Sequence, residues 1–76
     1  MTTSSANGGR VRTVVVVQRN LRHDWEVTPV GRARPQFFSN LDLAVGYAQL
    51  WGAIHRPSTV RVVADGGEIE EEWSFN

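Results

Sequence analysis

The alternation of apolar and polar residues predicts two β-hairpins with one helix between them. The stretch RVRTVVVVQRN, from Arg10, is rich in β-branched valines that fall on both faces, which is typical of a central strand. DWEVTPV then alternates strictly and is predicted to be the returning strand of a hairpin, after a turn at residues 20–23. RARPQFF could add a third short strand, and this alternative stays open because Pro35 fits only at an edge or at the start of a strand.

A helix is predicted from about Leu41 to His55. Ser39 or Asn40 can cap its first turn because either side chain offers an oxygen to unpaired backbone amides, and Pro57 is expected to stop the helix. One stripe of the helix is expected to pack on the sheet, and it consists of Leu41, Ala44, Ala48, Trp51 and His55.

The stretch STVRVVADGGEIEEEWSF predicts the second hairpin. A two-residue turn at Gly66-Gly67 places Arg61 opposite Glu72, and a turn at Asp65-Gly66 places it opposite Glu70. In either register Glu68, Glu70 and Glu72 line the solvent face of the last strand. Ile69, Trp73 and Phe75 line the apolar face.

Glu71 falls between Ile69 and Trp73, on the apolar face of the last strand. An unpaired buried carboxylate costs several kcal/mol. We therefore expect Glu71 to lie at the rim of the helix footprint, to pair with an arginine, or to face a partner chain.

These elements predict an α+β fold, in which one helix packs on one face of an antiparallel sheet of four or five strands, with the chain order β-β-(β)-α-β-β. Residues 1–9 are predicted to be a disordered tail and residues 10–76 a single small domain. The predicted core consists of Trp25, Ala44, Ala48, Trp51, Val62, Ile69 and Trp73.

A second apolar stripe lies about a third of a turn from the first on the same helix, and it consists of Leu43, Tyr47, Leu50 and Ile54. A domain this short buries only about 60% of its unfolded surface, and without cysteine it has no disulfide to compensate. The second stripe therefore either deepens the core together with Phe37 and Phe38 or forms a subunit interface.

Eight arginines balance eight acidic residues, and the arginines are concentrated near the N-terminus. In a compact domain, such a distribution indicates that the two ends of the chain pair in space. The alternative is a nucleic-acid-binding face made by Arg10, Arg12, Arg19, Arg22, Arg32 and Arg34, with Trp25 available for stacking on a base. The net charge of zero argues against strong nonspecific affinity for nucleic acid.

Catalytic and metal chemistry find little support in the residue spacing. His23 and His55 are the only histidines, there is no cysteine, and the carboxylates show no ligand spacing. We expect no metal, no cofactor and no catalytic residues. Without an apolar run long enough for a signal or a membrane helix, we expect a cytoplasmic protein with no membrane partner.

Several short elements together resemble a known family. They are WEV at residues 25–27, Gly31, Asn40 followed by Ala44 and Ala48, VRVV at residues 60–63, and DGGEIEEEWSF at residues 65–75. In this order, over residues 24–75, the chain is similar to the small prokaryotic family called domain of unknown function 2188. The resemblance implies the same plan of hairpin, helix and hairpin, and it implies no activity. The chain departs from the family at Leu41, where a basic residue is usual, in an extra glycine of the last turn, and in its lack of lysine.

From these observations, the favoured function is that of a noncatalytic protein-interaction module. Its expected partner is a second copy of the chain or another protein, bound through the stripe Leu43, Tyr47, Leu50 and Ile54. The alternative is a nucleic-acid-binding module that uses the arginines of the first hairpin.

Overall fold

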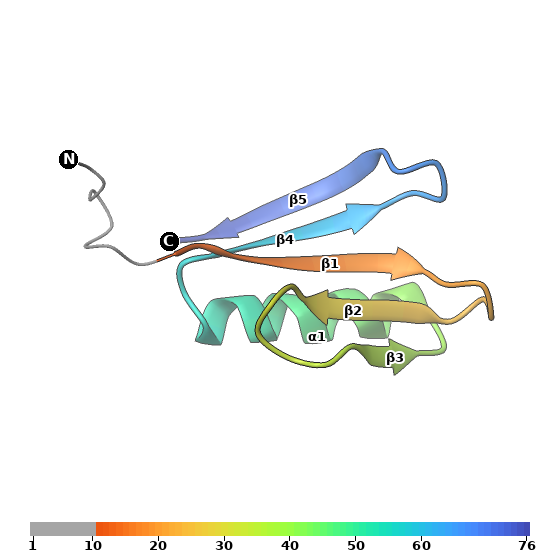
Figure 1. Cartoon of the computed structure of the whole chain (residues 1–76), viewed down its shortest axis with the longest axis horizontal. Helices are drawn as coiled ribbons and strands as arrows, with labels where there is room; N and C mark the ends of the chain where they lie inside the picture. The colour runs from red at the N-terminus through yellow and green to blue at the C-terminus, as the bar shows by residue number, and fades with distance from the viewer. Residues whose placement is uncertain (1–10) are drawn as a thin grey trace.

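One helix and five strands make up the domain, whose computed structural model describes residues 11–76. The tail expected at residues 1–9, together with Arg10, lies outside the described residues. In chain order the elements are β1 (Thr13–Arg19), β2 (Trp25–Pro29), β3 (Gln36–Phe38), α1 (Leu41–Ile54), β4 (Ser58–Val63) and β5 (Ile69–Phe75). The strands form one sheet in the order β3-β2-β1-β4-β5, with α1 against one face (Figure 1). The α+β class with a single helix is confirmed, and the stretch at Pro35 does contribute a third strand.

The sheet is mixed, so the expectation of an antiparallel sheet is wrong. The central strands β1 and β4 are parallel, with Val15 beside Val60 and Val17 beside Val62, whereas every other strand pair is antiparallel. The chain reverses direction at each connection, so that β1, β3 and β4 run one way while β2, α1 and β5 run the other (Figure 1). Because three segments separate β1 from β4, β4 starts at the same end of the sheet as β1.

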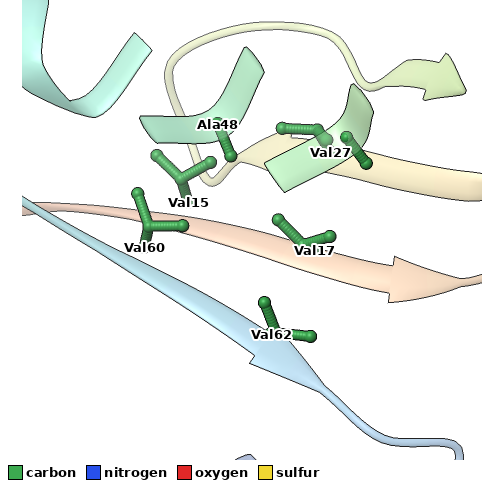
Figure 2. Close-up of a cluster of buried hydrophobic side chains, with 7 residues drawn as sticks. Val15, Val17, Val27, Ala48, Val60 and Val62 are labelled. Carbon is green, nitrogen blue, oxygen red and sulfur yellow. The ribbon is translucent and has the colours of Figure 1, made fainter. Parts of the chain in front are cut away.

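The core is built from small side chains. Val15, Val17, Val27, Val60 and Val62 project from the three central strands and are completely or almost completely buried. Ala44 and Ala48 of α1 are buried against them, and Figure 2 shows Ala48 beside these valines. The alanines let the helix axis approach the sheet closely, because methyl groups are all that separates the helix backbone from the valines.

The three tryptophans flank this core. A helix is about 10–12 Å wide, whereas five strands spaced by about 4.8 Å span roughly 19 Å, so one helix leaves both margins of the sheet uncovered. Trp25 on β2, Trp51 on α1 and Trp73 on β5 are half-buried and pack against the valine cluster. Of the residues predicted for the core, Ala44, Ala48 and Val62 are fully buried.

Ile69 was predicted for the core, and this prediction is wrong because its side chain is 53% exposed. Residues 64–68 connect β4 to β5. The Ala64 amide donates to the Glu68 carbonyl at 2.8 Å and the Gly67 amide donates to the Ala64 carbonyl at 2.9 Å, so the tight turn between Ala64 and Glu68 has three residues rather than the two that were predicted. Gly67 in this turn has φ +94°. A bulge follows, in which Val63 pairs with Ile69 but Val62 pairs with Glu71. Glu70 is the extra residue, and it moves Ile69 to the face of the sheet that the helix does not cover.

Beyond the bulge, Arg61 pairs with Glu72, and Arg61 Nε lies 2.5 Å from Glu72 Oε2. Glu71, Trp73 and Phe75 then share the helix side of β5. Glu71 is exposed there, at the margin that the helix does not reach, which fits the rim position that we expected.

Both ends of α1 are fixed by side chains. At the start, Asn40 Oδ1 accepts a hydrogen bond from the Leu43 amide at 2.9 Å, which identifies Asn40 as the N-cap. Near the end, the buried Ser58 hydroxyl donates to the Gly52 carbonyl at 2.6 Å and ties the helix to the first residue of β4. A Cβ on Gly52 would lie 3.0 Å from Ser58 Oγ and 3.1 Å from both Phe75 and Val60. Gly52 is therefore where the helix comes closest to the sheet.

The two helix glycines provide a matched pair of substitutions. Gly52→Ala should lower the free energy of unfolding by about 1–3 kcal/mol because the added methyl group overpacks the contact with Ser58 and Val60. Gly46→Ala should raise it by about 0.5–1 kcal/mol, because a Cβ at Gly46 meets nothing within 4 Å and alanine is the better helix former. Urea unfolding followed by tryptophan fluorescence, at low micromolar protein, measures both values. A stabilising Gly52→Ala would contradict the close helix–sheet contact.

Candidate interaction surface

The outer side of α1 carries a row of exposed apolar side chains. We call Leu43, Tyr47, Leu50 and Ile54 the outer stripe. Leu43 is 60% exposed, Leu50 is 61% exposed and Ile54 is 67% exposed. Full burial of an aliphatic side chain contributes about 1.5–3 kcal/mol to stability. The exposed side chains of this row therefore leave unused a free energy that a covering partner could supply.

Tyr47 differs from its three neighbours because it packs within the chain. Its ring lies 5.2 Å from the ring of Phe38, tilted by 57°. Phe37 pairs with Glu26 across the β2–β3 ladder and is exposed on the opposite face of the sheet. The expected packing of the stripe against Phe37 and Phe38 is therefore found only between Phe38 and Tyr47. Leu43, Leu50 and Ile54 remain exposed.

The outer stripe advances by four, three and four residues, which is the alternation that keeps a seam on one side of a helix in coiled coils. Gly46 is exposed, and it lies beside the stripe because it is three residues after Leu43 and four residues before Leu50. The stripe thus has the spacing of a helix–helix contact, and the residue beside it has no side chain to keep a second helix away.

Two of the predicted nucleic-acid contacts, Arg12 and Arg32, are engaged at the start of β1. Arg12 donates to the Ser58 carbonyl at 2.8 Å, to Thr59 Oγ1 at 3.3 Å and to the side chain of Asn76. Arg32 donates to Thr13 Oγ1 at 3.0 Å. Arg12 thereby ties the beginnings of β1 and β4 to the last residue of the chain.

Arg19 and Arg22 lie at the other end of β1, roughly 20 Å away. Arg19 contacts Asp65 at 3.4 Å, and its guanidinium lies 5.9 Å from the ring of Trp25. Arg34 follows β2 in the loop to β3, while Arg10 lies outside the described residues. The structure divides the described arginines of this set between the two ends of β1, and Arg12 joins the start of β1 to Asn76.

The turn between β1 and β2 lies at the predicted residues 20–23, and the side chain of Asn20 organises it. Asn20 Oδ1 accepts hydrogen bonds from the amides of Arg22 and Asp24, at 2.9 and 3.1 Å. His23 takes φ +67°, the left-handed conformation that such a turn requires. The sequence predicted the position of this turn but not the hydrogen bonds of the Asn20 side chain, although asparagine commonly accepts such bonds in turns.

The two histidines lie at different ends of the domain. His23 is in the β1–β2 turn, whereas His55 follows α1, with its ring stacked on Trp51 at 3.7 Å and its Nδ1 2.8 Å from the Trp51 carbonyl oxygen. Within residues 11–76, no group of three or more histidine, cysteine or acidic side chains is arranged to hold a metal ion. In the same part of the chain, no helix has the length and hydrophobicity needed to cross a membrane.

Comparisons with protein-family models, with curated proteins and with solved structures give no match to this chain. The resemblance to domain of unknown function 2188 therefore stays a prediction.

The contacts of Arg12 predict a structural role for its side chain. Arg12→Ala should lower the free energy of unfolding by about 1–2 kcal/mol, because it leaves the Ser58 carbonyl without its charged donor. Arg34→Ala is the matched control, since Arg34 is exposed in a loop and such surface changes stay within about 0.5 kcal/mol. Thermal and urea unfolding by circular dichroism measure both changes. Equal effects of the two substitutions would contradict the role of Arg12.

Proposed function

We propose that this chain is a small noncatalytic interaction module that self-associates through the outer stripe of α1. The observation that carries the proposal is the exposure of Leu43, Leu50 and Ile54 along one row of the helix whose other side is packed on the sheet. Covering these side chains would remove a row of large aliphatic groups from water, which is favourable.

The size of the domain supports association. Among residues 11–76, the fully buried hydrophobic side chains are five valines and two alanines, which is a small core for a chain without cysteine. Burial of large aliphatic side chains between two copies would add stability that the isolated core lacks, because binding to the folded state shifts the folding equilibrium.

The expected affinity is modest. The helix has 14 residues and is therefore about 21 Å long, so a contact restricted to it falls at the small end of specific interfaces, below about 1,200 Å² in total. We expect a dissociation constant on the order of micromolar or weaker.

The nucleic-acid alternative has less support than self-association. Arg12, Arg19 and Arg32 are engaged in contacts within the chain, and the arginines of the first hairpin lie at two ends of a strand. A backbone-binding surface needs several cations on one continuous face.

Sedimentation equilibrium tests the proposal with a matched pair of leucine variants. Leu50→Glu places a charge inside the contact, where an unpaired carboxylate is costly, so this variant should be monomeric at concentrations at which the parent protein is dimeric. Leu21→Glu introduces the same charge at a fully exposed loop residue, and it should associate like the parent. A parent protein that is monomeric at about 1 mM, or a Leu50→Glu variant that associates like the Leu21→Glu control, would exclude the proposal.

A further inference from the structure

We infer, on the basis of the self-association proposed above, that the partner is a second copy bound with its helix antiparallel. In this arrangement, α1 of one copy packs against α1 of the other about a twofold axis at the midpoint of the outer stripe, between Ala48 and Gln49. The two sheets then lie on the outside and the two helices in the middle.

The spacing of the outer stripe is self-complementary under this axis. Leu43 and Ile54 are equally far from the midpoint of the stripe, and so are Tyr47 and Leu50. A twofold axis exchanges residues that are equally far from it. Leu43 of one copy therefore faces Ile54 of the partner, and Tyr47 faces the partner's Leu50, so that all four residues of both copies are matched in one register.

The charges at the ends of the helix select the antiparallel direction. Asp42 lies in the first turn of α1, and Arg56 follows the last turn. Arg56 Nε donates to the Ala53 carbonyl at 3.0 Å, which holds the guanidinium close to the helix end. An antiparallel pair brings Asp42 close to the partner's Arg56 and opposes the two helix dipoles. A parallel pair instead places Asp42 at the same level along the axis as the partner's Asp42, and about a helix length from the partner's Arg56.

Gly46 gives independent support to the close approach of a second helix. A glycine inside a helix is less favourable than alanine. Gly52 has a packing reason within the chain, because a side chain there would meet Ser58, Val60 and Phe75, whereas a Cβ at Gly46 meets nothing within 4 Å. Gly46 and Ala53 are seven residues apart on the flank of the outer stripe that also holds Asp42. A partner helix that passes over this flank can approach closely because neither residue has a long side chain.

Disulfide exchange tests the direction, since the chain contains no cysteine. Leu43→Cys and Ile54→Cys variants, one of them labelled with ¹⁵N, are mixed in equal amounts in a glutathione buffer, and the disulfide-linked dimers are counted by mass spectrometry. In the antiparallel pair, two copies of the same variant hold their thiols about 16 Å apart along the axis, which is too far for a disulfide. The mixed disulfide should therefore exceed each homodisulfide at least tenfold. Leu21→Cys, in the exposed loop, gives the background yield.

The possible results separate the direction from self-association itself. An excess of the mixed disulfide supports the antiparallel pair. An excess of the two homodisulfides overturns the antiparallel direction while self-association through the stripe stands. A random distribution, at the yield of the Leu21→Cys control, overturns both.

A charge exchange provides a second measurement that does not use cysteine. At low salt, Asp42→Arg should weaken dimerisation about fivefold, because it sets two cations against each other at both ends of the helix pair. The double variant Asp42→Arg and Arg56→Asp should restore the parent affinity. Failure of the double variant to restore it, with all variants folded by circular dichroism, overturns the antiparallel register.

Discussion

The structure depends on how closely a single helix can approach a sheet that is wider than the helix. Ala44, Ala48 and Gly52 form the row of α1 that touches the sheet, and the valines of β1, β2 and β4 fill the space below them. Small side chains bring the helix close but leave the sheet margins uncovered. Aromatic residues complete the layer there, with Trp25 and Phe38 on one side of the helix and Trp73 and Phe75 on the other. The outer stripe is exposed because the fold has only one helix layer. One side of α1 packs on the sheet, and no other element packs on Leu43, Leu50 and Ile54 in the described residues.

Local patterns predicted the elements well, because each depends on neighbouring residues. Valine-rich alternation identified β1, and the cap at Asn40 identified the start of α1. The parallel pairing of β1 and β4 was missed because it depends on how many segments the chain inserts between them. The short strand after Pro35 is one of these segments, and leaving it open left the direction of β4 open too. Ile69 was misplaced for a similar reason, since one extra residue in a strand exchanges the two faces.

The candidate surface was only partly visible in the sequence. A helical wheel shows that Leu43, Tyr47, Leu50 and Ile54 share one row, but it does not show what lies above them. Phe38 packs against Tyr47, whereas Leu43, Leu50 and Ile54 stay exposed. Phe38 reaches Tyr47 because β3 lies at the edge of the sheet. The arginines illustrate the opposite case. Arg12, Arg19 and Arg32 are close in the sequence and read as one basic hairpin, yet the length of β1 and the placement of their partners separate them.

The parallel pair at the centre of the sheet has a consequence for how the chain can fold during synthesis. Val15 and Val60 are neighbours in space, although most of the chain lies between them in the sequence. The first hairpin alone has no strand on its other side and no helix above it, and an isolated two-stranded hairpin is marginally stable at best in water. The pairing of β1 with β4 can form only after the ribosome has released β4, so the core cannot be completed before residues 58–63 have been synthesised. Such dependence on distant contacts slows folding relative to a helical bundle of equal length.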